Sequence, residues 1–436
     1  MRTYCLVAWL AAHLLAAPAM AAPGDLDPSF GTGGYVQIGG VGTDATGLSL
    51  RPDGRIAVAI LGYQRGAILQ FLANGGADVS FGTGGRADLP IQPSGGLARQ
   101  QSGKLIAFGG IAGVGLAIAR VDTDGSVDPT FGVAGVASTG RPMGQWAGSV
   151  ALQSSGNILA AYAWGLGSRG PFLSAVARHL VDGAVDPSFG AGGSAMAEYG
   201  RWPEVAVDAA DRILLARLWD IDNKAVMLRL TAAGARDASF GQGGAAFPPT
   251  GAEAAVDGVA VQADGRIVTI GWGWDGRVGG SGGPLMLVRY LPNGTPDPAF
   301  GSGGVAQVRP PNPDPMRASI AVQPDGRIIV AANLPSSSPG IVVLRLLPDG
   351  SPDATFGNNG TVTTAPIYFT PGIMSIAIQP DGKILVLTSN GILLRYLGGG
   401  GPAAVAEVPS LAPGALALLA VAVAALAGIA LRRRDA

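Results

Sequence analysis

Short apolar runs separated by glycine-rich turns fill this chain from Asp25 to Leu397. Runs such as Ser319 to Gln323 and Ile328 to Ala331 have the period of two that is typical of half-buried strands. A Pro-Asp-Gly turn lies between these two runs, and this arrangement predicts a tight hairpin. Between the N-terminal leader and Gly400 we find no stretch with a helical period. The pattern predicts an all-β fold.

Each hairpin is followed by two more apolar runs. Third runs include Val226 to Leu230 and Ile341 to Arg345, and they lead into Asn-Gly or Asp-Gly turns. A short fourth run follows, such as Tyr35 to Ile38 or Val305 to Val308. Each unit therefore supplies four antiparallel strands.

Two phrases recur in order along the chain. One is close to Gln-Pro-Asp-Gly-(Arg/Lys)-Ile, with worn second to fourth copies, and the other is Asp-x-(Ser/Thr/Ala)-Phe-Gly-x-x-Gly. The phenylalanines of the second phrase are separated by 51, 50, 58, 51, 60 and 56 residues, a spacing that indicates a repeat array. Seven four-stranded units predict one domain, a seven-bladed β-propeller over residues 24–397. The repeat phenylalanines are Phe30, Phe81, Phe131, Phe189, Phe240, Phe300 and Phe356.

The two ends of the array complement each other. The segment that begins at Asp25 supplies a fourth strand without its first three, and the last unit stops at Leu397 after three strands. We expect the N-terminal strand to complete the last blade, which removes an exposed sheet edge. In five repeats an arginine of the third strand precedes an aspartate of the Phe-Gly phrase by eight residues, so the partner of Arg395 should be Asp27.

With its alternating Phe-Gly and Gln-Pro-Asp-Gly phrases, the chain resembles the delta-60 repeat family of bacterial secreted proteins over residues 24–397. The resemblance implies a propeller-like repeat. It brings no defined activity and no catalytic residues.

Composition narrows the range of partners. Glycine accounts for 70 of 436 residues and falls mostly at the expected blade turns. The net charge is −1 and only 14% of residues are charged, so the basic face expected of a nucleic-acid-binding protein is missing.

The first 21 residues have the features of a signal peptide. Arg2 precedes an apolar run from Leu6 to Ala17, and Ala19-Met20-Ala21 fits a cleavage site. A first transmembrane helix is the alternative. Cleavage would remove Cys5, the one cysteine, so we expect neither disulfide nor thiol chemistry.

The C-terminus has three parts after a linker at 398–407. A short motif precedes an apolar segment of about 413–431, which is just long enough to span a bilayer as a helix, and three arginines follow. The arginines predict a cytoplasmic end and a propeller held outside the inner membrane. The motif residues are Val408, Pro409, Ser410 and Leu411, and the arginines are Arg432, Arg433 and Arg434.

This tail, residues 408–436, resembles the Gram-negative C-terminal sorting signals of the Ile-Pro-Thr-Leu type, although Ala412-Pro413-Gly414 replaces the usual tryptophan-glycine. The resemblance implies an exosortase-like membrane protease as a partner, and release or transfer of the propeller to the cell surface. A permanent single-pass anchor is the alternative.

Residues for catalysis are scarce. The one histidine after the leader, His179, lies in a predicted third strand, where a structural role is expected. No Ser/His/Asp set, Cys/His metal spacing or phosphate loop is present, and we expect no cofactor. Asp122 to Asp128 carries oxygens at alternate positions, but turn chemistry explains it more simply than a calcium loop does.

The best binding clue is the position of the tryptophans. All six after the leader fall in loops that follow second and fourth strands of three adjacent blades, a setting suited to a sugar, peptide or protein ligand. We therefore predict a non-enzymatic binding or display module, with simple packing of loop bases as the alternative role of the rings. A polysaccharide lyase or glycosidase using Asp220 or Asp275 is the alternative function. The candidate surface contains Trp146, Trp164, Trp202, Trp219, Trp272, Trp274, Arg201, Asp220 and Asp275.

Overall fold

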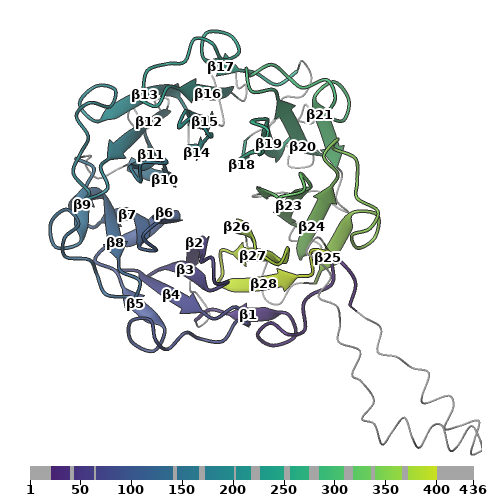
Figure 1. The fold of residues 1–436 in the computed structure, drawn as a ribbon, viewed down its shortest axis with the longest axis horizontal. Coiled ribbons are helices and arrows are strands. Elements are labelled where there is room, and N and C mark those ends of the chain that lie inside the picture. Colours follow the sequence, from purple (N-terminus) through teal and green to yellow (C-terminus); the bar gives the residue numbers. More distant parts are fainter. Residues whose placement is uncertain are drawn as a thin grey trace, which may run out of the picture. The chain divides into compact units, whose positions relative to one another are not determined.

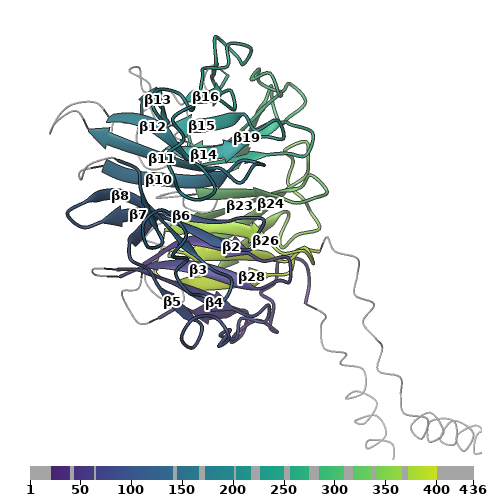
Figure 2. The same ribbon diagram turned by 60° about the vertical axis from the view of Figure 1, so that its left-hand side comes forward.

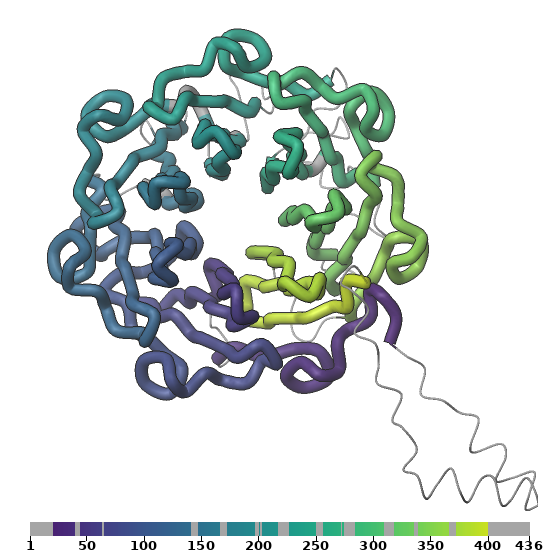
Figure 3. The backbone as a smooth tube through the Cα atoms, in the orientation of Figure 1, coloured from purple at the N-terminus to yellow at the C-terminus, as the bar shows by residue number. Residues whose placement is uncertain are grey.

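The fold is known from a computed structural model, and its regular elements are all strands within the part of the chain that it describes (Figure 1). Seven sheets of four strands each are arranged around a common centre, as the tube in Figure 3 also shows. The predicted seven-bladed propeller is confirmed. The described residues are 21–39, 44–62, 65–140, 145–165, 172–200, 203–217, 226–249, 256–273, 284–308, 318–334, 339–365 and 372–399.

Within each of the first six blades, the strands are paired in sequence order and antiparallel. Blade 1 contains β2 (Asp44–Leu50), β3 (Ile56–Leu61), β4 (Ala67–Phe71) and β5 (Arg86–Asp88). Blade 2 contains β6 (Gln92–Arg99), β7 (Leu105–Ile111), β8 (Gly115–Val121) and β9 (Val136–Ser138). Blade 3 contains β10 (Gln145–Leu152), β11 (Ile158–Gly165), β12 (Phe172–His179) and β13 (Ser194–Tyr199).

Blades 4 to 7 follow the same plan around the ring. Blade 4 contains β14 (Glu204–Val207), β15 (Ile213–Arg217), β16 (Val226–Leu230) and β17 (Ala245–Ala246). Blade 5 contains β18 (Gly258–Val261), β19 (Ile267–Trp272), β20 (Leu285–Tyr290) and β21 (Val305–Val308). Blade 6 contains β22 (Ala318–Val322), β23 (Ile328–Asn333), β24 (Ile341–Leu346) and β25 (Thr361–Thr364). Blade 7 contains β26 (Ile373–Ile378), β27 (Ile384–Thr388), β28 (Ile392–Tyr396) and, from the other end of the chain, β1 (Tyr35–Gln37).

Blade 7 confirms the predicted closure of the ring. Strand β1 pairs antiparallel with β28, in the register Tyr35 opposite Leu394. The Asp27 N–H donates to the Arg395 carbonyl at 2.8 Å, and the two side chains form an ion pair at 2.9 Å. The fourth strand begins at Tyr35, because the Phe-Gly phrase itself forms turns, with the Gly34 N–H donating to the Phe30 carbonyl at 3.0 Å.

Hydrophobic cores lie between the blades. Each of seven clusters combines side chains of two neighbouring sheets and contains one repeat phenylalanine that is at most 1% exposed. Full burial of such a ring stabilises the fold by roughly 1.5–3 kcal/mol. The repeated phenylalanine therefore fills the interface between two neighbouring blades, which we call a seam. One such residue is needed for each seam, and this explains its regular period.

An arginine covers the phenylalanine ring at six of the seven seams. In each case the guanidinium lies 4.3–4.6 Å from the ring centroid and pairs with the repeat aspartate at 2.7–2.9 Å. The same arginine donates from Nη1 to a carbonyl of the next blade. For Arg289 the acceptor is Pro348, and for Arg395 it is Ala73, in blade 1. We call this bond the arginine latch.

A second latch uses the backbone of the Phe-Gly phrase. The Gly241 N–H donates to the Asn293 carbonyl at 2.7 Å, and the Gly357 N–H donates to the Pro23 carbonyl at 2.9 Å. The turn that accepts both latches needs a glycine. At Gly294 φ is +85°, and a Cβ atom there would lie 2.8 Å from the Phe240 ring. The Asn-Gly and Asp-Gly turns thus serve both chain reversal and close packing of neighbouring blades.

Antiparallel order gives the ring two different faces. Connections after first and third strands lie on one face, which we call the turn face. Connections after second and fourth strands lie on the other, which we call the loop face. Figure 2 shows the blades side-on. On the turn face, a backbone latch joins each blade to the next around the whole ring.

The predicted signal peptide up to Met20 and the whole C-terminal tail from Gly400 lie outside the described residues. Within the described ranges, no helix is long and apolar enough to cross a bilayer.

Candidate functional site

The turn face is occupied by structural contacts. In blade 6 the Asp353 carboxylate accepts from Arg345 and Arg327, each at 2.8 Å, and from the Thr355 hydroxyl at 2.6 Å. Burial opposes ionisation of Asp353, but these hydrogen bonds and the Arg345 charge outweigh it and lower the pKa to about 2. Such a carboxylate is a fixed anion that holds blades together, and it is poorly suited to proton transfer near neutral pH.

One seam departs from this arrangement. Blade 1 has Gln70 in place of the arginine, and Gln70 donates to Asp78 at 2.8 Å while its Oε1 is buried without a partner among the described residues. Arg99 of blade 2 lies at this seam instead. Its Nε donates to the Leu50 carbonyl of blade 1 at 2.7 Å, and burial lowers its pKa to about 10. An arginine therefore bridges blades 1 and 2 from the first strand rather than from the third.

The backbone places the three described tryptophans at the loop-face ends of strands in blades 3 and 5, whereas the sequence predicted them in the loops beyond these strands. In blade 3, Gln145 pairs with Trp164 and Trp146 with Ala163, at the loop end of the first hairpin. In blade 5, Trp272 is the last residue of β19 and pairs with Leu285. These three residues lie on the predicted face of the ring, and the binding surface itself stays a prediction.

Trp164 is the one candidate ring whose surroundings are described. It is half-buried, packs against the core between blades 2 and 3, and stacks on Tyr162 with ring centroids 5.8 Å apart and an interplanar angle of 28°. Trp164 thus packs the base of a loop, and its role in ligand binding stays a prediction.

Six members of the predicted surface lie outside the described residues, and they are Arg201, Trp202, Trp219, Asp220, Trp274 and Asp275. Their described neighbours fix where these loops start. The Val205 N–H donates to the Ser149 hydroxyl at 2.7 Å, which ties the first strand of blade 4 to that of blade 3 just after Trp202. The Ala318 N–H donates to Asp257 at 3.2 Å and joins blades 5 and 6 in the same way. The loops therefore start from a rigid rim.

The remaining titratable candidates have structural partners. His179 is fully buried, its Nδ1 lies 3.0 Å from the Gly183 carbonyl, and burial lowers its pKa, so it occupies the structural position expected of it. In the former calcium candidate, Lys104 pairs with Asp122 at 2.8 Å and with Asp128 at 2.7 Å. Asp124 accepts from the Ser126 hydroxyl at 2.7 Å. Among the described residues, no group of three or more His, Cys, Asp or Glu side chains is placed to hold a metal ion.

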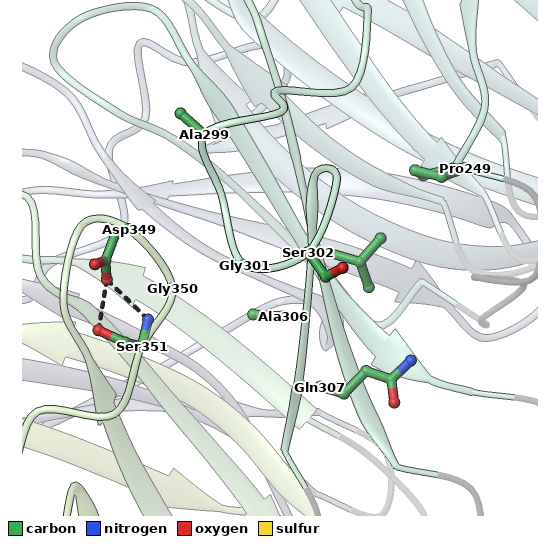
Figure 4. Close-up of a pocket in the computed structure, with 10 residues that line it drawn as sticks. Pro249, Ala299, Gly301, Ser302, Ala306, Gln307, Asp349, Gly350 and Ser351 are labelled. Atoms are coloured by element: carbon green, nitrogen blue, oxygen red, sulfur yellow. Dashed lines mark hydrogen bonds between the residues drawn. The ribbon is translucent and has the colours of Figure 1, made fainter.

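Two recesses in the described part of the molecule bear on ligand binding. One, of about 410 Å³, lies on the turn face between blades 7 and 1, and its Lys383 and Arg395 are already paired with carboxylates. The other, of about 730 Å³, lies over the outer strand of blade 5 and is lined by Pro249, Ala299, Ser302, Gln307 and the turn at Asp349 (Figure 4). This second recess was not predicted from the sequence. One sequence feature marks it, because Ala299 takes a position that Ser or Thr holds in the other repeats.

These features define the chain as a seven-bladed β-propeller with four antiparallel strands per blade. A family model described as a domain of unknown function (DUF5122) beta-propeller matches residues 100–131, 262–300 and 323–356, which supports a propeller repeat family. No curated protein sequence matches the chain.

Comparison with solved structures finds several distant similarities, of which the first has a TM-score above 0.5. A streptogramin B lyase is 12% identical, with a TM-score of 0.51, and the match covers 83% of this chain and 96% of that one. A virginiamycin B lyase from Staphylococcus aureus is 10% identical, with a TM-score of 0.49 and coverage of 83% and 98%. A glucose dehydrogenase is 14% identical, with a TM-score of 0.44 and coverage of 84% and 99%. At these identities the likeness concerns the fold alone.

Proposed function

We propose that this chain is an exported propeller that acts as a binding or display module and catalyses no reaction. Its ligand would be a glycan, a peptide or a protein, bound by the loop face of blades 3 to 5. The observation that carries this proposal is the asymmetry of the two faces. Latches and ion pairs occupy the turn face, whereas the tryptophans belong to strand ends and loops on the opposite side. Aromatic rings next to charged groups suit such ligands, and a rigid rim limits the entropy lost on binding.

The test is a binding screen of residues 22–399 against glycans, peptidoglycan fragments and surface proteins. Replacing Trp272 and Trp274 together by alanine should weaken binding of the screen's best ligand by about tenfold or more, since buried aromatic anchors dominate such sites. A Trp272→Phe/Trp274→Phe variant keeps the rings and should retain most of the affinity. Equal binding by the alanine variant, with an unchanged circular dichroism spectrum, would refute the proposal.

A lyase or glycosidase that uses Asp220 and Asp275 makes a different prediction for the same samples. Incubation with a bound polysaccharide would then release shorter products, and Asp220→Asn or Asp275→Asn would stop their release while leaving binding in place. Mass spectrometry of the supernatant separates the two functions. We expect intact ligand.

We further infer export and processing at both ends, in line with the resemblance to delta-60 repeat proteins and to sorting signals of the Ile-Pro-Thr-Leu type. Ala22 donates to the Asp25 carboxylate and the Pro23 carbonyl accepts from the Gly357 N–H, so a chain that starts at Ala22 would keep these contacts of the last blade. In a Gram-negative host, terminal mass spectrometry should find a mature chain starting at Ala22. With an exosortase-like protease present, the chain should end near Leu411. Full-length tails in every fraction would instead indicate a permanent membrane anchor.

A further inference from the structure

The recess over blade 5 combines apolar walls with several separate polar groups. Strand β21 supplies Val305 and Ala306, and Pro249 closes the side toward blade 4. The turn of blade 6 faces it with Asp349 and Ser351, whose hydroxyl and N–H both donate to the Asp349 carboxylate (Figure 4). A volume of about 730 Å³ lies within the range of small-molecule sites.

A second, independent feature of this recess is a hydroxyl that the repeat lacks. In the six other Phe-Gly phrases, the residue before the phenylalanine is Ser or Thr, and its hydroxyl donates to the repeat aspartate at 2.5–2.7 Å. In the five of these repeats that carry an arginine latch, the hydroxyl also accepts from the arginine Nη2 at 2.8–3.4 Å. In blade 5 this residue is Ala299, which lines the recess.

The aspartate beneath Ala299 is prepared to accept a further hydrogen bond. Asp297 is 2% exposed, and its Oδ1 accepts the Ala299 N–H at 3.0 Å. Burial opposes its ionisation, but this backbone bond and the Arg289 charge outweigh burial and lower the pKa of Asp297, so it stays anionic. In the other arginine repeats, the hydroxyl at this position donates to the aspartate and accepts from the arginine through one oxygen. A hydroxyl does both, whereas a peptide nitrogen only donates and a carbonyl oxygen only accepts.

We propose that this recess binds a polyhydroxylated ligand of monosaccharide size, a free sugar or the end of a glycan, with one ligand hydroxyl replacing the missing serine hydroxyl between Asp297 and Arg289. The side chains of Asp349, Ser302 and Gln307 supply further partners for ring hydroxyls, and Pro249 and Val305 cover the apolar face of the ring. This site is separate from the tryptophan surface and does not rest on it.

The test measures sugar binding to residues 22–399 by ligand-observed NMR, with glucose, galactose, N-acetylglucosamine and short oligosaccharides. We expect at least one of them to bind with a dissociation constant of about 1–10 mM or below. Ala299→Ser supplies the hydroxyl from the protein, so it should weaken binding by about tenfold and raise the thermal midpoint. If oligosaccharides bind and monosaccharides do not, the ligand is a glycan end rather than a free sugar.

The matched control is Ser239→Ala, which removes the same hydroxyl in blade 4, away from the recess, and should lower the thermal midpoint without changing the affinity. Asp349→Asn, at an exposed turn, gives a second variant and should weaken binding severalfold. No binding of any sugar at about 50 mM, or equal affinity in the wild type and in Ala299→Ser, would overturn the proposal. So would a crystal structure that shows only water at this position under saturating sugar. Trp272→Ala/Trp274→Ala should leave this affinity unchanged, so failure of one site is separable from failure of the other.

Discussion

One carboxylate per repeat organises the contacts of its blade. The Asp353 carboxylate is held by Arg345, by Arg327 and by the Thr355 hydroxyl. Arg345 also lies over the Phe356 ring and donates to the Gly398 carbonyl. Asp353 and Arg345 are both nearly fully buried and have lost their hydration. The attraction between the two charges compensates for this loss. A buried pair of this kind fixes geometry more than it adds net stability.

Removing one partner should therefore be costly. We expect Asp353→Ala to lower the free energy of unfolding by about 3–5 kcal/mol, because Arg345 stays buried without its counterion. The control is Asp325→Ala, which removes an exposed turn carboxylate paired with Arg327 and should cost no more than about 1 kcal/mol. Urea unfolding followed by circular dichroism measures both. Similar losses for the two variants would contradict this account.

The same carboxylates predict acid unfolding. The pKa of Asp353 falls from an ordinary 3.8 to about 2 in the folded chain, and the pKa values of Asp27, Asp186 and Asp237 are lowered too. Below the ordinary value the unfolded chain binds more protons than the folded one. The stabilisation is thus complete above about pH 4 and is lost as the pH falls toward about 2.

Thermal midpoints recorded from pH 7 down to pH 2 check this prediction. We expect a flat region at higher pH and a steep decline below about pH 4, with a shallower decline in Asp353→Asn, which lacks one of the titrating groups. A midpoint that rises on acidification would contradict the assignment of these groups as buried anions.

At the scale of strands and blades, the seam between blades 1 and 2 is the exception. It joins through Arg99 and through the backbone latch from Gly82 to Asp124, at 2.6 Å, but not through an arginine of the third strand. The buried, unpartnered Oε1 of Gln70 indicates that the usual latch position is incompletely satisfied there.

Restoring the arginine should strengthen this seam. Gln70→Arg places a guanidinium next to Asp78 and over Phe81, and we expect the free energy of unfolding to rise by about 1 kcal/mol or more. The reciprocal change, Arg120→Gln, makes the same gap one seam further on and should destabilise by about 2–3 kcal/mol, since Asp128 then keeps Lys104 but loses its buried charged partner. Hydrogen exchange of β4 and β8 would locate both effects. If Gln70→Arg destabilises the ring, the prediction is wrong, and the Arg99 contact is sufficient to join blades 1 and 2.

Strands could be predicted from the sequence because their period of two is a local property. Val305 to Val308 and Ile341 to Leu346 were found in this way. The fourth strand starts at Tyr35 as predicted, and the Phe-Gly phrase before it forms turns that hydrogen-bond locally. The bridge from Arg99 to Leu50 depends on how two blades meet across the ring, and local sequence does not specify this contact.

The candidate sites were predictable in part for the same reason. The phase of the repeat located the tryptophans on the loop face, and the described strand ends of Trp146, Trp164 and Trp272 agree. Ala299 was visible as a substitution in the Phe-Gly phrase, but its meaning needs the recess and the six hydroxyl contacts beside it. Ligand identity depends on the shape of loops, which a repeat pattern does not encode.

At the scale of the whole molecule, the two ends of the domain form one blade together. The Gly24 N–H donates to the Leu397 carbonyl at 2.7 Å, and the Leu397 N–H donates to the Asp25 carbonyl at 2.9 Å. Arg345 donates to the Gly398 carbonyl and Gly357 to the Pro23 carbonyl, so the last seam uses both chain ends. Closure therefore depends on contacts between distant parts of the chain, such as Gly24 with Leu397, which are 373 positions apart.

Removing residues 22–38 should open the ring. The shortened chain loses β1, the Phe30 core and the partner of Arg395, and it exposes the edge of β28, so we expect aggregation or a thermal midpoint at least about 10 °C lower. Adding a synthetic peptide of residues 22–38 should restore part of the loss. A shortened chain that is monomeric and as stable as the full domain would contradict closure by this strand.

The most direct test of the central claim, that the loop face of blades 3 to 5 is the binding surface, is a tryptophan fluorescence titration of residues 22–399. All six tryptophans of this segment belong to the candidate surface, so their emission reports on it alone. With the best ligand of the binding screen, we predict a saturable change in emission, reduced quenching by iodide, and loss of most of this response in Trp272→Ala/Trp274→Ala. Saturable binding of that ligand with unchanged emission and unchanged quenching would contradict the claim.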